Sequence, residues 1–224
     1  LLDGPLEVVG ENGPLRLGGP KQRATLAILL LNANRVVSVD RLADDLYSGA
    51  APVTAVTQVQ RQISELRKAL GAGSIIDTQA PGYVIHLAPE QLDLHRFEQL
   101  TEEARRAEAR LAADRLREAL ALWRGEALAD LAFEPFARSA IDRLEEIRLA
   151  ALERRLEADL ALGRHAEATA ELEELVAEHP LRERLRGQLM LALYRSGRQA
   201  EALDVYRQAR TTLVEEFGLE PSAG

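Results

Sequence analysis

The chain has 224 residues and a formal net charge of −8, with 46% hydrophobic, 29% charged and only 4% aromatic residues. It contains no cysteine, which excludes disulfides, thiol catalysis and cysteine metal sites. The negative charge argues against bulk attraction to nucleic acid. The longest apolar run, residues 26–31, is too short to span a membrane. We also recognise no secretory leader, so we expect a cytoplasmic protein of one or two domains.

The first ninety residues alternate short strand signals with helix signals. The runs LEVV and LRL predict a small hairpin around the turn signal Asn12-Gly13. A mostly buried helix is expected from Pro20 to about Leu31, because a proline suits the first turn of a helix. A second, short helix is expected after Ser38, which is a suitable N-cap residue.

The next segment, TAVTQVQRQISELRKAL at residues 54–70, predicts an amphipathic helix with an unusual outer face. Its expected buried stripe consists of Val56, Val59, Ile63, Leu66 and Leu70. The opposite side carries mostly hydroxyls, an amide and cations: Thr54, Thr57, Gln58, Arg61, Glu65 and Lys68. Arginine can bind guanine and glutamine can bind adenine in the major groove, so this face could contact bases. The alternative is an ordinary solvated surface.

After this helix, SIIDTQAPGYVIHL predicts a second hairpin. The order of hairpin, three helices and hairpin is that of a winged helix-turn-helix. On this interpretation Glu65 either accepts from cytosine or pairs with Arg61 one turn earlier, and we favour the pairing. The candidates for phosphate or backbone contact are Thr54, Arg67, Lys68, Lys21, Arg23, Thr78 and Gln79. For the four cations, helix-dipole pairing or plain surface exposure is an equally good explanation.

From Leu94 onward the pattern is helical, and it contains an internal repeat. LGRHAEATAELEEL and SGRQAEALDVYRQA align with a period of 34 residues, so that Gly163 matches Gly197 and Leu172 matches Tyr206. We expect Leu172 and Tyr206 to occupy the same inward position. This period is typical of tetratricopeptide repeats, which stack helix pairs and usually bind other proteins.

No catalytic or cofactor-binding grouping is recognisable, so we predict neither an enzyme nor a metal or cofactor site. The four histidines, His86, His95, His165 and His179, are scattered without metal-ligand spacing. No phosphate-binding glycine loop such as GxxxxGK[ST] or GxGxxG is present. The single tryptophan, Trp123, is expected to be a core anchor.

Several stretches resemble one bacterial family across nearly the whole chain. They include LGGPKQRATLAILLLNANRVVSVDRLADDLY, VQRQISELRKALG, PGYVIHL, LALWRGEALADL and LRERLRGQLMLALYRSGRQAEALDVYRQARTTLVEEFGLEP. Together they resemble the Streptomyces antibiotic regulatory proteins and the amino-terminal part of AfsR-like regulators. These proteins join an OmpR-type winged helix to a bacterial transcriptional activation domain.

The resemblance implies a DNA-binding transcriptional activator of antibiotic or other secondary-metabolite genes. It implies that the third helix enters the major groove of direct repeats, with Thr57, Gln58, Arg61 and Gln62 facing bases. It also implies that two protomers bind side by side and that the helical part contacts RNA polymerase, including its primary sigma factor. In this family Glu65 often has an arginine counterpart, and TQAPGY lacks the basic residues of some relatives.

We therefore expect a mainly α protein with a small α+β part. Residues 1–90 would form a winged helix-turn-helix DNA-binding domain, and residues 91–224 an all-α, tetratricopeptide-like activation domain. The competing hypothesis is a protein-interaction scaffold of tetratricopeptide type without specific DNA binding.

Overall fold

The structure is a computed structural model that describes residues 1–218 except 3, 11–12, 48, 50 and 72–74. Contacts group the chain into two units. The first unit contains Leu1–Gln99 and Ala119–Arg148, and the second contains Leu100–Glu118 and Leu149–Gly224. This grouping does not test the expected domain boundary at residue 90, which stays a prediction.

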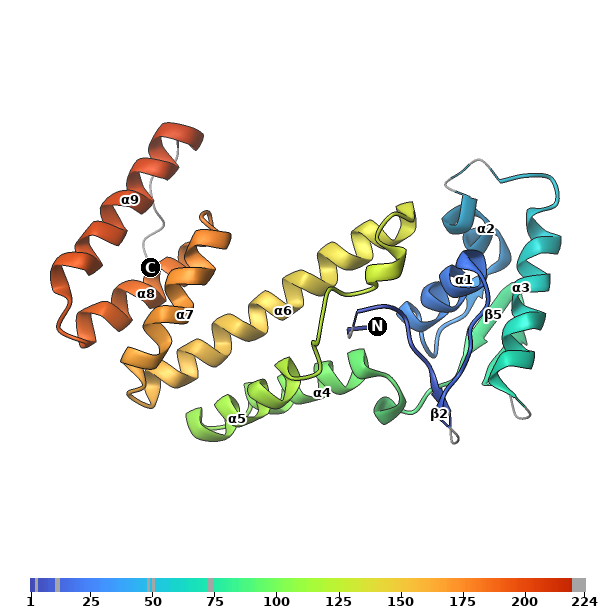
Figure 1. Cartoon of the computed structure of the whole chain (residues 1–224), viewed down its shortest axis with the longest axis horizontal. Helices are drawn as coiled ribbons and strands as arrows, with labels where there is room; N and C mark the ends of the chain where they lie inside the picture. The colour runs from blue at the N-terminus through green and yellow to red at the C-terminus, as the bar shows by residue number, and fades with distance from the viewer. Residues whose placement is uncertain (3, 11–12, 48, 50, 72–74, 219–224) are drawn as a thin grey trace. The chain divides into compact units, whose positions relative to one another are not determined.

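The first unit begins with the predicted order of elements (Figure 1). A two-stranded hairpin pairs β1 with β2, although Asn12 of its expected turn lies outside the described residues. Three helices and a second hairpin follow, as predicted. The Ser38 hydroxyl accepts a hydrogen bond from the Arg41 backbone N–H, which confirms its capping role. The bounds are β1 Val9–Gly10, β2 Gly13–Pro14, α1 Pro20–Leu31, α2 Val39–Tyr47, α3 Ala55–Leu70, β4 Ile76–Gln79 and β5 Gly82–Ile85.

The second hairpin carries an additional strand that the sequence pattern did not predict. The strand β3, Val37–Ser38, pairs antiparallel with β5 and gives a sheet of order β3-β5-β4. A Cβ added at Gly82 would lie 1.8 Å from the Val37 carbonyl oxygen, so only glycine fits this approach. Gly82 therefore does more than complete a turn after Pro81, because it lets two strands pair.

The core of this winged helix lies between α1, α2, α3 and β5. Most of α1 is buried, as expected. The buried stripe of α3 consists of Ala55, Val59, Ile63 and Leu66. Val56, expected in this stripe, is instead 44% exposed, and that expectation was wrong. The helix starts at Ala55, and a spacing of four from Val59 places Ala55, rather than Val56, on the inner face.

The rest of the first unit packs around Trp123, which is buried as predicted. The Phe97 ring meets its indole edge-on at 5.6 Å, and the Arg148 guanidinium lies 5.3 Å from the ring centroid. The N-terminal residues return to this region, where the backbone N–H of Leu6 donates to Asp130 at 2.8 Å. The helices between the second hairpin and residue 161 are η1 Pro89–Gln91, α4 Asp93–Arg105, α5 Ala109–Leu120, η2 Ala129–Leu131 and α6 Pro135–Ala161. Most of α5 and the last parts of α4 and α6 belong to the second unit.

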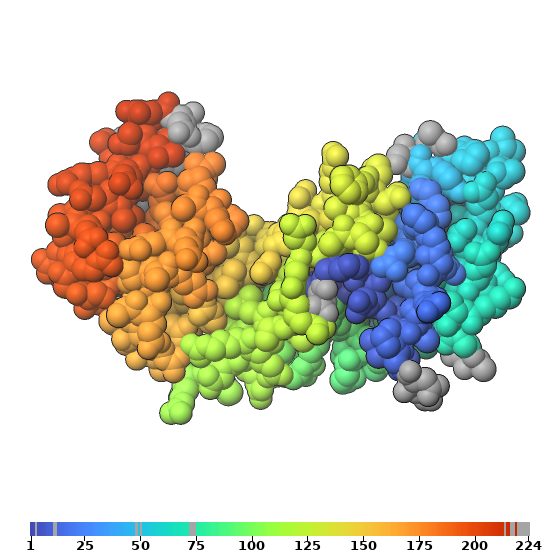
Figure 2. Space-filling model, in the orientation of Figure 1, coloured from blue at the N-terminus to red at the C-terminus, as the bar shows by residue number. Residues whose placement is uncertain are grey.

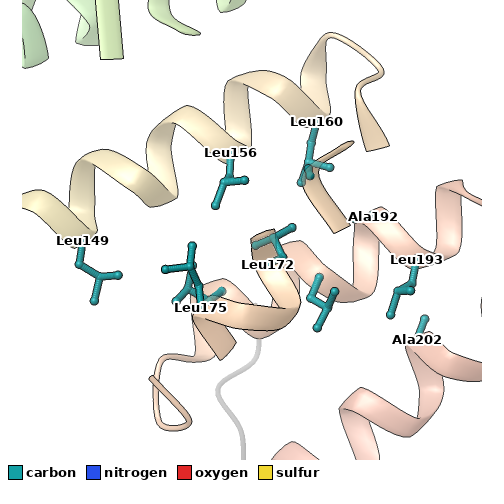
Figure 3. Close-up of a cluster of buried hydrophobic side chains, with 11 residues drawn as sticks. Leu149, Leu156, Leu160, Leu172, Leu175, Ala192, Leu193 and Ala202 are labelled. Atoms are coloured by element: carbon teal, nitrogen blue, oxygen red, sulfur yellow. The ribbon is translucent and has the colours of Figure 1, made fainter. Parts of the chain in front are cut away.

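The second unit contains the predicted helical repeat. The helices α7 His165–Glu178, α8 Glu183–Arg195 and α9 Gln199–Phe217 follow α6. The repeat-matched glycines Gly163 and Gly197 have φ angles of +81° and +79°, so both close a helix in the left-handed conformation. Leucines of α6, α7 and α8 meet in one buried cluster (Figure 3). The two repeats are thus α6 with α7, and α8 with α9.

One expectation about the repeat was wrong. Leu172 is fully buried, but Tyr206, its counterpart, is 44% exposed. The helix α8 packs against α7 and covers Leu172, whereas no helix among the described residues covers the equivalent side of α9. The sequence pattern predicted the helix and its inner face correctly. It did not predict that no helix among the described residues would pack over that face in the second repeat.

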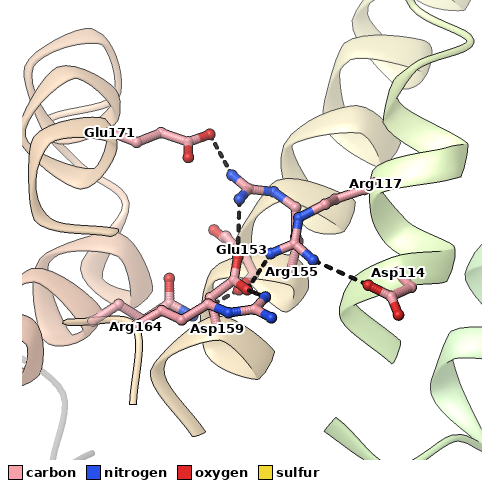
Figure 4. A network of polar contacts seen from close by, with 8 residues as sticks. Asp114, Arg117, Glu153, Arg155, Asp159, Arg164 and Glu171 are labelled. Atoms are coloured by element: carbon pink, nitrogen blue, oxygen red, sulfur yellow. Dashed lines mark hydrogen bonds and ion pairs between the residues drawn. The ribbon is translucent and has the colours of Figure 1, made fainter. Parts of the chain in front are cut away.

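The first repeat also contains a buried carboxylate, Asp159, surrounded by arginines (Figure 4). Arg155 and Arg164 approach it at 3.0 and 2.8 Å, and Arg117 of α5 also contacts it. Buried charges persist in proteins when they are paired in this way. Asp159 therefore links α5, α6 and the turn before α7.

Among the described residues, no helix is long and apolar enough to cross a lipid bilayer.

Candidate nucleic-acid interface

The outer face of α3 lies at the surface of the first unit (cyan to teal in Figure 2). Of the four residues expected to contact bases, Thr57, Gln58 and Arg61 are exposed and Gln62 is half-buried. Thr54 precedes the helix and is also exposed. The structure therefore presents these side chains together on one accessible face, which is the geometry that contact with a DNA groove requires.

Gln58 is held in place by two neighbours. Its side-chain amide donates to the Thr54 hydroxyl at 3.0 Å, and its carbonyl oxygen accepts a hydrogen bond from the Tyr47 hydroxyl. A glutamine amide has two hydrogens and two lone pairs, so one donor and one acceptor site remain. Adenine needs that pair of sites for a bidentate contact. Tyr47, which closes α2, was missed by sequence reasoning because no periodic signal distinguishes it.

Arg61 pairs with Glu65 one helical turn later, at 2.9 Å. This confirms the expected pairing role of Glu65. The arginine side chain is 75% exposed, and exposed pairs at this spacing contribute only about 0.3–0.5 kcal/mol. Exchanging Glu65 for a guanine edge would therefore cost little. The carboxylate holds the guanidinium along the helix face.

Arg67 connects the end of α3 to the second hairpin. Its guanidinium donates to the Ile76 carbonyl at 3.0 Å and to the Thr78 hydroxyl at 2.9 Å, and it lies 5.8 Å from the centre of the Tyr83 ring. The phosphate candidates Arg67 and Thr78 are therefore brought together. The hydrogen bond between them links α3 to β4. Lys68 and Gln79 are exposed beside them.

The two cations at the start of α1 make contacts inside the first unit. The Lys21 ammonium donates to the Leu46 carbonyl at 2.6 Å and lies 3.4 Å from Glu134. Arg23 pairs with Asp130 and donates to the Leu6 carbonyl at 2.6 Å. These bonds give both cations a structural role that the sequence left open, and a role at phosphate stays a prediction.

These groups can form hydrogen bonds and ion pairs with a polyanion that displays base edges. In the part of the chain that the structure describes, no cluster of three or more His, Asp or Glu could hold a metal ion. Three short helices with a β-ribbon after the third define a winged-helix regulator of transcription, here followed by stacked helical repeats.

Comparison with known proteins agrees with this class. Residues 92–224 match the bacterial transcriptional activator domain, and residues 13–85 match the C-terminal domain of transcriptional regulatory proteins. The chain therefore belongs to the family of Streptomyces antibiotic regulatory proteins, whose members are transcriptional regulators rather than enzymes.

Individual relatives cover the chain almost completely. It is 42% identical to the regulatory protein DnrI of Streptomyces peucetius, over 91% of the chain and 80% of DnrI. It is 45% identical to the regulatory protein AfsR of Streptomyces coelicolor, over 99% of the chain but only 23% of AfsR. The solved structure of Mycobacterium tuberculosis EmbR in complex with a low affinity phosphopeptide matches 99% of the chain and 61% of EmbR. Its TM-score is 0.94 and its identity is 38%.

Proposed function

We propose that this chain is a sequence-specific transcriptional activator that binds direct repeats in bacterial promoters through α3. In this proposal Thr57, Gln58, Arg61 and Gln62 contact bases in the major groove. The hairpin β4-β5 lies along the adjacent backbone, where Thr78, Gln79 and Lys68 reach phosphate or sugar. Thr54, Arg67, Lys21 and Arg23 would bind phosphate through donors that their internal bonds leave free.

The observation that carries this proposal is the outer face of α3. It combines an exposed arginine held by a weak exposed ion pair with a glutamine whose amide is oriented by Tyr47 and Thr54. Together the two side chains could distinguish guanine and adenine at neighbouring positions. Solubility alone does not require the amide to be held in one orientation.

The remaining parts of the proposal rest on the family. Residues 91–224 would support a homodimer on DNA and contact RNA polymerase, including its primary sigma factor, and residues 1–90 would be the DNA-binding domain. Family members such as DnrI and AfsR are named as regulatory proteins. We infer that the target genes direct antibiotic or other secondary-metabolite synthesis in the bacterial cytoplasm.

The test is a fluorescence-anisotropy titration of the full chain against duplex DNA with paired direct repeats, selected from randomised duplexes. Arg61→Ala should weaken binding by about 1–3 kcal/mol and relax the preference at one base pair. Lys68→Ala should weaken binding to all sequences similarly and lower the slope of log Kd against log salt by about one.

Arg207→Ala is the matched control. Arg207 is 71% exposed and pairs with Asp204, three residues earlier on α9. The variant thus removes the same charge from a similarly exposed helix position outside the proposed interface. It should leave the affinity for DNA unchanged. A folded protein that binds scrambled and repeat DNA equally would overturn the proposal and favour the scaffold hypothesis.

A further inference from the structure

Among the described residues, the second repeat presents an uncovered groove between α8 and α9, with the end of α6 at its edge. The groove has a volume of about 1120 Å³, and all its lining residues belong to the second unit. Tyr194 of α8 is 60% exposed, and Leu203 of α9 is 56% exposed. Large apolar side chains gathered at one surface commonly mark a binding site.

The internal repeat indicates what fits this groove. The residues that line the groove occupy the same repeat positions, 34 residues later, as the residues that α8 covers in the first repeat. The matched pairs are Leu156 with Met190, Leu160 with Tyr194, Leu172 with Tyr206, and Leu175 with Ala209. In the first repeat these positions are buried against Leu185, Leu189 and Ala192 of α8, which are spaced four and three residues apart. The second repeat therefore offers a seat of the same kind to another helix.

The two seats differ in their charged side chains. On the first repeat, Arg182, which precedes α8, and Arg184 of α8 pair with Glu153 and Glu157 at 2.7 and 2.6 Å. In the second repeat the counterparts of these glutamates are Gly187 and Leu191, which cannot bind a cation.

The second seat is lined by Arg184, Arg186 and Arg195 together with Glu157 and Glu183, and Arg184 pairs with Glu157. Arg186 is only 9% exposed, and its Nε has no hydrogen-bond partner among the described residues. A buried donor without an acceptor is costly, and a carboxylate would satisfy it best.

We propose that this groove binds an acidic amphipathic helix of a partner protein, in the place that α8 takes on the first repeat. The helix would present leucine-like side chains at positions i, i+4 and i+7 to Tyr194, Leu203 and Tyr206. A glutamate or aspartate beside this stripe would pair with Arg186. This inference does not depend on DNA binding.

The test uses a displayed library of helical peptides with randomised faces, selected on the full chain. Enriched peptides should carry the i, i+4, i+7 apolar stripe together with carboxylates. Their affinity should fall by about tenfold or more for Leu203→Asp and for Arg186→Gln, since apolar anchors and buried charges dominate such interfaces. Circular dichroism checks that each variant is folded, and Leu203→Asp stays informative if Arg186→Gln is not.

Leu111→Asp is the matched control, because Leu111 is 50% exposed on α5 and does not line the groove. It should leave peptide affinity unchanged. Enrichment of basic peptides, or of none that distinguish Leu203→Asp from Leu111→Asp, would overturn the proposal. So would sedimentation equilibrium that shows a dimer of this chain dissociated by Leu203→Asp, since a second copy would then fill the groove.

Discussion

Leu172 lies fully buried beneath α8, whereas Tyr206, at the equivalent position of the second repeat, is 44% exposed. Arg164 and Arg198, which follow the two matched glycines, differ for another reason, because the counterpart of Asp159 in the second repeat is Leu193. Arg164 pairs with the buried Asp159, but Arg198 pairs with Glu201 and Glu173 at the surface. Equivalent positions of a repeat thus share a backbone conformation while their energetic weight depends on whether a neighbouring helix covers them and on which residues surround them.

The largest effect is expected at the buried carboxylate of the first repeat. Asp159→Ala would leave three arginines around an apolar gap, and loss of one partner from a buried pair costs about 3–5 kcal/mol of unfolding free energy. Urea unfolding followed by circular dichroism measures it. The control Asp204→Ala breaks only the exposed pair with Arg207 and should cost less than about 1 kcal/mol. Equal losses would show that Asp159 is solvated.

A matched pair of alanine substitutions tests whether packing by α8 distinguishes the two repeats. Leu172→Ala should lower the free energy of unfolding by about 2–5 kcal/mol, because it leaves a cavity beneath α8. Tyr206→Ala should cost under about 1 kcal/mol, because its site is already open to solvent. Urea unfolding of both variants compares them directly. If the two losses were similar, the second repeat would be covered in solution and the contrast would fail.

The smallest effect is a pH dependence at the surface pair of the second repeat. Arg198 donates hydrogen bonds to Glu201 at 2.7 and 2.5 Å and holds the pKa of that carboxyl below its ordinary value. A lowered pKa in the folded state stabilises the protein above the ordinary pKa, and this stabilisation is lost as pH falls through the lowered pKa.

Glu201→Gln should therefore slightly lower the urea midpoint near neutral pH and leave it unchanged in acid. The control Glu167→Gln alters the matched position of the first repeat, where Glu167 is exposed. A midpoint difference for Glu201→Gln that grew on acidification would contradict the sign of this pKa shift.

Sequence pattern predicted most of the elements because their signals are local. Pro20 begins α1, Ser38 caps α2, and Gly163 and Gly197 occupy left-handed positions after their helices. The strand β3 was missed because a two-residue strand has no periodicity of its own and exists only by pairing with β5. Val56 was placed on the inner face because spacings of three and four residues both fit one side of a helix. Ala55, four residues before Val59, takes the buried position instead.

The candidate interface was predictable in its composition but not in its connections. The outer face of α3 follows from helical geometry, so Thr57, Gln58 and Arg61 could be selected from the sequence. Several of its hydrogen bonds and ion pairs join segments that are distant in the sequence. Arg67 bonds to the hairpin, Lys21 to Leu46, and Arg23 to Asp130. Tyr47 likewise reaches Gln58 across a loop. Only the folded chain brings such partners together.

The close approach of Gly82 to Val37 has a consequence for how this fold can diversify. The backbone of β5 is fixed against β3 at a point where no side chain fits, so its position is insensitive to the neighbouring residues of the hairpin. Thr78 and Gln79 on β4 are exposed and take no part in that approach. The side chain of Gln79 can therefore be exchanged for another without changing the approach of β5 to β3.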